Sequence, residues 1–176
     1  MNTLKAFGAG LASAAMVTAA AQPAAAREYF VGGPVHIQDM EIVANYLVGV
    51  QMAPMTKSMV MSGPNVIHLE ADVHATADNK YGYPDGAWVG YLTIQYLVQK
   101  LGANWHAAGT LKPMTAKDGP HYADNIQMAG PGKYKVTYRF ISPESNGFYH
   151  HIDKETGVPS WWAPFSTAFV FDYPKK

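Results

Sequence analysis

The sequence predicts an all-β protein, folded as an immunoglobulin-like antiparallel β-sandwich, with a closed barrel as the alternative. Three observations support this fold class. Several short runs alternate apolar and polar residues, which is the side-chain period of a β-strand. Clusters of Gly, Pro, Asn, Asp and Ser separate these runs. Residues 27–176 contain no stretch with the 3.6-residue apolar period of an amphipathic helix.

The expected strands follow one another at regular intervals along the chain. After a short strand at 29–37, they are Met40–Val50, Asn65–Ala75, Ala87–Gln99, His106–Pro113, Lys133–Ile141 and Phe165–Tyr173. The run Lys133–Ile141 shows the pattern well, because aromatic or branched side chains occupy every second position. Three segments rich in Met, His or Trp are expected to be loops: Pro54–Met61, Met114–Tyr122 and Gly147–Trp162.

The first 26 residues are predicted to be a secretory signal peptide, cleaved after Ala26. Lys5 provides the positive charge, an Ala-rich apolar run follows, and Ala24-Ala25-Ala26 is a small-residue cleavage site. A membrane anchor is the alternative, but the apolar run is short and is followed by Pro23. Residues 27–176 then form a single domain, which we expect in the periplasm with no membrane insertion after cleavage.

The composition of residues 27–176 excludes some classes of partner and ligand. Loss of Lys5 leaves 12 basic residues against 13 acidic ones, and this balance argues against a nucleic-acid or polybasic membrane role. The chain has no cysteine, so the exported domain depends on its core rather than on disulfides. Any metal must therefore be bound by His, Met, Asp or Glu.

The segment His68-x-Glu70-x-Asp72-x-His74 carries the strongest functional signal. On a strand, these four side chains share one face, whereas the apolar residues between them face the core. Two imidazoles and two carboxylates in a row are typical of a mixed nitrogen and oxygen metal site. A solvent-facing strand that happens to be rich in His and acid is the alternative.

Candidate donors also lie in the expected loops. Met114, His121 and either His150 or His151 could join His68 in a site of three imidazoles and one thioether, a donor set that favours copper. Glu70 is a harder donor, suited to iron or manganese or to orienting a histidine. Each donor also has a structural alternative: Met114 as a core residue, His121 as part of a turn. The Met residues of 52–61 are either a soft metal-collecting surface or a contact patch.

Several motifs resemble those of the periplasmic iron-transport proteins that bind copper and are encoded beside iron permeases in many bacteria. The matching stretches are Ile67–Thr76, Gly86–Ile94, Pro113-Met114, Asp118–Tyr122, Gly132–Thr137, Ser142-Pro143 and His151–Val158. They occur in order and cover nearly all of residues 27–176.

The resemblance implies an immunoglobulin-like fold and a homodimer with a metal site near the dimer interface. Carried over by position, the copper ligands are His68, Met114, His121 and His151, and Glu70 is the carboxylate for a second metal, iron or manganese. His151 is preferred to His150 because it immediately precedes the stretch Ile152–Gly157.

Three functions are consistent with these residues. The first is a non-enzymatic periplasmic protein that binds copper, helps hold iron or manganese, and delivers iron to an inner-membrane permease. The second is a copper-dependent ferroxidase, and the third a copper chaperone or resistance protein with no iron role. The sequence has no Gly-x-Ser-x-Gly, no Gly-rich phosphate loop and no His-Glu-x-x-His, so no hydrolase is indicated.

Overall fold

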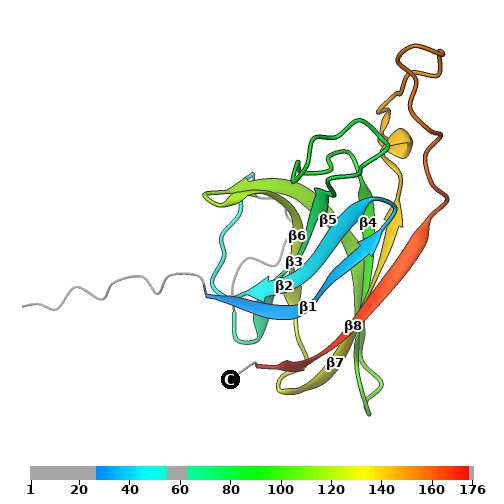
Figure 1. Ribbon diagram of the computed structural model, residues 1–176. Helices are drawn as coiled ribbons and strands as arrows, with labels where there is room; N and C mark the ends of the chain where they lie inside the picture. Colours follow the sequence, from blue (N-terminus) through cyan, green and yellow to red (C-terminus); the bar gives the residue numbers. More distant parts are fainter. Residues whose placement is uncertain (1–26, 55–62, 175–176) are drawn as a thin grey trace, which may run out of the picture.

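The computed structural model describes residues 27–54 and 63–174, which form eight β-strands and one short 3-10 helix (Figure 1). The elements are β1 (Glu28–Ile37), β2 (Met40–Leu47), β3 (Val66–Ala75), β4 (Thr93–Lys100), β5 (His106–Ala116), β6 (Gly119–Gln127), β7 (Gly132–Ile141), η1 (Pro143–Asn146) and β8 (Phe165–Tyr173). The predicted signal peptide and the predicted Met surface at Met55, Met59 and Met61 lie outside the described residues.

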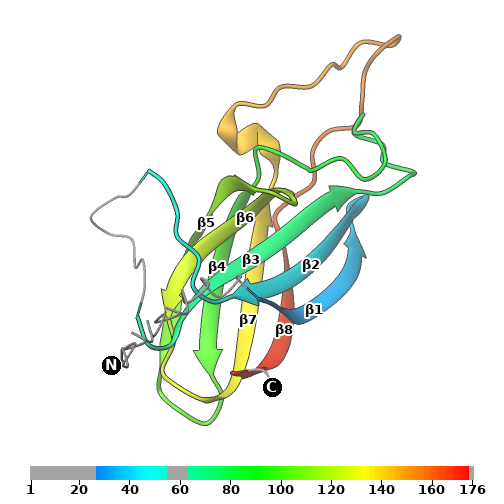
Figure 2. The ribbon, with the colours of Figure 1, turned by 90° about the vertical axis from the view of Figure 1, so that its left-hand side faces the viewer.

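The strands form one antiparallel sheet in the order β1-β2-β3-β6-β5-β4-β7-β8. Strand β5 joins its two halves, because its first residues up to Leu111 pair with β4 and its last residues from Lys112 pair with β6. The sheet therefore folds over into two layers, and Figure 2 shows β1, β2, β3 and β6 in front of β4, β7 and β8. The prediction of an all-β antiparallel fold is confirmed, and the folded sheet is nearly closed.

The core lies between the two layers and follows the predicted alternation. On β3, the four apolar residues Ile67, Leu69, Ala71 and Val73 are completely buried. They belong to one cluster with apolar residues of β4 and β7, among them Ile94, Val98, Val136 and Phe140. The hydroxyl of Tyr138 crosses this core and donates a 2.8 Å hydrogen bond to the backbone carbonyl of Glu70. That bond holds the backbone of β3 in place at Glu70, whose carboxyl group lies on the polar face of the strand.

Two expected elements differ in the structure. The segment Met114–Tyr122 is not a loop but the hairpin that joins β5 to β6, with Ala116 opposite Gly119. The φ angle of +134° at Gly119 explains this turn, because residues with a Cβ rarely adopt that conformation. The strand expected at Ala87–Gln99 begins only at Thr93. Tyr91, with a φ of +61°, interrupts the extended chain before it.

Tyr122 ties the segment before β4 to the centre of the sheet. Its buried hydroxyl donates to the carbonyl of Val89 at 2.8 Å and accepts from the amide of Leu92 at 3.0 Å. Tyr122→Phe leaves both backbone groups buried without this partner, so we expect it to lower the free energy of unfolding by about 1–3 kcal/mol. Chemical denaturation measures this loss. Tyr91→Phe, at an exposed tyrosine, is the control, and equal stability of the two variants would contradict the role of the hydroxyl.

Candidate metal centre

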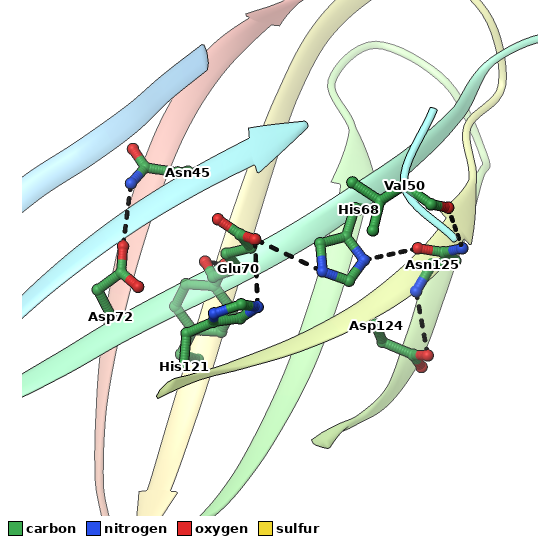
Figure 3. A network of polar contacts seen from close by, with 9 residues as sticks. Asn45, Val50, His68, Glu70, Asp72, His121, Asp124 and Asn125 are labelled. Carbon is green, nitrogen blue, oxygen red and sulfur yellow. Dashed lines mark hydrogen bonds and ion pairs between the residues drawn. The ribbon is translucent and has the colours of Figure 1, made fainter. Parts of the chain in front are cut away.

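The polar face of β3 meets β6 in a buried cluster of three metal-binding side chains. His68, Glu70 and His121 each offer a ligand atom, and these three atoms lie within 4.8 Å of one another. The Oε1 atom of Glu70 lies 3.5 Å from Nε2 of His68 and 3.4 Å from Nε2 of His121 (Figure 3). All three residues are buried. Strand register explains the arrangement: His68 is opposite Asn125, and Glu70 is opposite the small Ala123, which leaves space for its carboxyl group.

The neighbour of His68 determines which of its nitrogens is free. Nδ1 of His68 lies 2.7 Å from Oδ1 of Asn125, and an amide oxygen can only accept, so Nδ1–H is the donor. The amide of Asn125 is oriented in turn by a 3.5 Å bond from Nδ2 to the carbonyl of Val50. Nε2 of His68 therefore keeps its lone pair and faces Glu70 and His121, as in metal sites where the second nitrogen is held by an outer partner.

His121 and Met114 are placed beside each other by the hairpin. The two residues are opposite each other in the register of β5 and β6, and both line a hollow of about 720 Å³ with His68, Glu70 and Asp118. Nε2 of His121 is buried, and among the described residues it has no hydrogen-bond partner. A buried imidazole nitrogen that makes no hydrogen bond, beside a second imidazole and a thioether, suits a soft or borderline transition metal such as copper.

Burial sets the charge state of the site in the metal-free protein. It raises the pKa of Glu70 from 4.5 to about 8, and the nearby carboxylates of Asp72, Glu28 and Asp118 act in the same direction. Burial lowers the pKa of His68, although the hydrogen bond to Asn125 offsets part of this effect. At neutral pH the Glu70 carboxyl group is therefore mainly protonated beside neutral His68, and the lone pair on Nε2 of His68 is available to a metal ion.

The raised pKa of Glu70 predicts a pH-dependent stability. Between pH 4.5 and about 8, the folded metal-free protein keeps a proton that the unfolded chain releases, so stability falls as the pH rises through this range. Glu70→Gln removes this titration. We expect the variant and the wild type to be equally stable below pH 4.5, and the variant to be more stable above pH 8 by an amount of the order of a few kcal/mol. Denaturation with a chelator present measures the difference, and parallel pH profiles would contradict the assignment.

Three carboxylates extend the cluster beyond Glu70. Ligand atoms of Glu28, Glu70 and Asp72 also lie within 4.8 Å of one another, and Asp118 lines the same hollow as these residues. The amide of Asn45 donates a 3.1 Å hydrogen bond to Asp72. Burial is the main cause of the raised pKa of Asp72. This set of oxygen donors suits a hard cation, and it shares Glu70 with the nitrogen donors.

The structure brings together four of the five residues that the sequence singled out. His68, Glu70, Met114 and His121 line one hollow, and Met52 joins them. His151 does not line it. Its side chain is 74% exposed on the segment between β7 and β8, and Nδ1 contacts the hydroxyl of Thr156 at 2.7 Å. Both ribbon views show this segment projecting beyond the strands (Figures 1 and 2).

Asn125 and Glu28 were not among the predicted site residues, whereas Asp72 belonged to the predicted row of metal-binding groups on β3. Recognition of β6 as a strand would have placed Asn125 on the same face as His121, because the two are four residues apart. Glu28 has no comparable signal, since it comes to the site only through the pairing of β1 with β2 and of β2 with β3.

Comparison with known proteins gives a consistent family assignment. The family model described as Fe2+ transport protein matches residues 25–174. A UPF0423 protein of Brucella abortus is 41% identical over 159 residues, which cover 88% of this chain and 86% of the relative. A copper-bound variant of P19 from Campylobacter jejuni has a TM-score of 0.80 and 39% identity, covering 84% of this chain and 98% of that one.

A copper-bound variant of FetP from uropathogenic Escherichia coli strain F11 has the same TM-score, 0.80, with 42% identity and coverage of 84% and 98%. Within the described residues, the structure has no helix long and apolar enough to cross a membrane. The match to the family model extends over nearly all of residues 27–176, and the chain therefore belongs to the Fe2+ transport protein family.

Proposed function

We propose that this protein is a periplasmic metal-binding protein of iron acquisition. It holds copper on His68, Met114, His121 and His151, and it delivers iron to an inner-membrane permease. Residues 1–26 direct its export and are cleaved after Ala26. The copper-bound P19 and FetP structures support copper as the metal, and the family assignment supports a role in iron acquisition.

The observation that carries the proposal is the buried nitrogen pair beside a thioether. Nε2 of His68 and Nε2 of His121 both face Oε1 of Glu70 at about the same distance, 3.5 Å and 3.4 Å. Nε2 of His121 makes no hydrogen bond among the described residues despite its 3.4 Å contact with Glu70, and such a buried nitrogen is costly unless it binds a ligand, because it has lost its water. Copper satisfies both nitrogens and the sulfur of Met114 at once.

His151 takes part through a second copy of the chain. Its side chain points to solvent in one chain, and the neighbouring Tyr149 and Ile152 are 88% and 86% exposed. A hollow of about 470 Å³, lined by Trp88, Leu92, Leu111 and other residues, adjoins the site through Pro113. A homodimer in which each projecting segment covers the other copy would bury these apolar side chains and bring His151 to the metal.

The second ion is held on the oxygen side of the same site. Glu70 faces both the imidazoles and the carboxylates of Glu28 and Asp72, so one residue connects a soft donor set with a hard one. Iron or manganese suits the oxygen donors, and copper suits the nitrogen and sulfur donors. Copper is then the resident metal, and iron is the cargo.

Growth under iron limitation tests the function. A deletion strain should grow poorly with a chelator of iron, and the wild-type gene should restore growth whereas His68→Ala should not. Uptake of radioactive iron by whole cells measures transport directly. Normal growth and uptake in the deletion strain would instead favour a copper chaperone or resistance protein without an iron role.

A copper-dependent ferroxidase is a second candidate, favoured by the position of the carboxylates next to the copper donors. In that reaction four Fe(II) ions each lose one electron, and oxygen takes up these electrons with four protons to give two waters. Steady oxygen consumption with Fe(II), lost in Met114→Leu, would support turnover. Binding without oxygen consumption would leave the protein a carrier.

A further inference from the structure

We propose that Thr156 and Asp153 are positioning residues, which hold the ring proton of His151 on Nδ1 so that Nε2 is the atom this side chain offers to a metal ion. The three residues lie between η1 and β8, and none of them lines the hollow that contains His68 and His121. Their role in binding rests on the proposed function, in which His151 is a copper ligand.

The direction of each hydrogen bond around Thr156 follows from its acceptor. At neutral pH Asp153 is a carboxylate, which can only accept, so the 2.8 Å bond to its Oδ2 takes the single proton of the Thr156 hydroxyl. The hydroxyl oxygen then has only lone pairs to offer Nδ1 of His151, which lies 2.7 Å away. Nδ1 therefore carries the ring proton, and Oδ2 of Asp153, 3.7 Å away, favours the proton at that position.

Local hydrogen bonds hold these side chains in place. Oδ1 of Asp153 accepts from the amide of Thr156 at 2.9 Å. The amide of Gly157 donates to the carbonyl of Asp153 at 2.9 Å, and the amide of Val158 donates to the carbonyl of His151 at 3.0 Å. A Cβ atom on Gly157 would overlap the carbonyl oxygen of Asp153, so only glycine allows the chain to return this closely. The turn itself thus brings the Thr156 hydroxyl to His151.

These contacts leave Nε2 of His151 free. Among the described residues it has no hydrogen-bond or ion-pair partner, and the side chain is exposed. His68 is held in the same way, with Nδ1 bonded to Asn125 and Nε2 directed toward Glu70. Histidines that bind a metal generally donate their other ring N–H to such a partner, which fixes the tautomer and the ring orientation. The exposed segment therefore carries a histidine whose tautomer suits a metal before any metal binds.

Thr156→Val and Thr156→Ser separate the hydroxyl from the shape of the side chain. Valine keeps the branched shape but accepts no hydrogen bond, whereas serine keeps the hydroxyl. Nuclear magnetic resonance of the imidazole nitrogens identifies the tautomer in the metal-free protein, and loss of signals in His151→Ala assigns them. At about pH 8.5, where an unperturbed imidazole is neutral, we expect Nδ1–H in wild type and Thr156→Ser. We expect a mixture of both tautomers in Thr156→Val, because the bond that selects one of them is lost.

Copper affinity measures the consequence for binding. In competition with a chelator of known affinity, Thr156→Val should bind Cu(II) about tenfold or more weakly than wild type, which is the usual effect of removing the outer partner of a metal-bound histidine. Thr156→Ser should bind copper as wild type does. Thermal unfolding of the variants verifies that these exposed substitutions leave the fold intact.

An Nε2–H tautomer in metal-free wild type, or an unchanged Nδ1–H tautomer in Thr156→Val, would overturn the proposal. Equal copper affinity in Thr156→Val and wild type would also overturn it, provided that His151→Ala binds copper more weakly. Wild-type copper binding by His151→Ala would instead count against the proposed function, since the tautomer is measured without metal and is decided independently.

Discussion

His121→Ala will abolish stoichiometric copper binding while leaving the fold intact. The substitution removes one of two buried imidazole nitrogens that face the same carboxylate oxygen, and no other described His lines the hollow. Loss of a ligand from a site of few donors typically costs more than the 10–100-fold in affinity that loss of an outer partner costs. Metal analysis after Cu(II) loading and desalting should therefore find less than about a tenth of the wild-type copper.

The fold should survive this change because the structure gives Nε2 of His121 no hydrogen bond to lose. Circular dichroism verifies that the variant keeps the β-sheet. His106→Ala is the matched control, since it removes an exposed imidazole from β5 without approaching the hollow. Full copper binding by folded His121→Ala would show that the cluster on β3 and β6 is structural and would refute the copper site.

The alternation of apolar and polar residues was sufficient to predict most of the strands. It succeeded where one face is buried and the other is exposed, as in β7, where Tyr134, Val136, Tyr138 and Phe140 are buried. It failed for β6, because this strand lies between β3 and β5 and carries polar residues on both faces. Asp124 and Asn125 are adjacent polar residues, so they break the alternation of apolar and polar positions. Asp124 accepts a hydrogen bond from Lys112 on β5, and Asn125 accepts one from His68 on β3.

The candidate site was predictable in part for the same physical reason. A period of two along β3 was enough to place His68 and Glu70 on one face, and the structure agrees. The sequence placed Met114 and His121 in one candidate site, but their cross-strand register was not predictable, because it depends on a hairpin where a loop was expected. Glu28 reaches Glu70 through strand pairing, because it is opposite Leu47 on β2 and Leu47 is opposite His68 on β3; no local sequence pattern encodes pairing between strands so far apart in the chain.

His151→Ala should also lose copper, and a mixed dimer should regain about half of it. In the proposed dimer, a twofold axis would give two equivalent sites, each built from His68, Met114 and His121 of one chain and His151 of the other. Each variant alone, His121→Ala or His151→Ala, then lacks one ligand in both sites. Co-expression of the two variants with different tags allows the mixed dimer to be isolated by sequential affinity purification.

In the mixed dimer, both defects fall in the same site if His151 acts across the interface. The chain with His151→Ala keeps an intact His121, and it receives an intact His151 from the other chain, so one complete site is restored. If His151 instead acted within its own chain, each site would keep one defect and the mixed dimer would bind no copper. Full copper in the His151→Ala homodimer would exclude His151 as a ligand. Recovery of half the wild-type copper is therefore a result that only completion across the interface produces, and it would explain why the projecting segment leaves His151 exposed in a single chain.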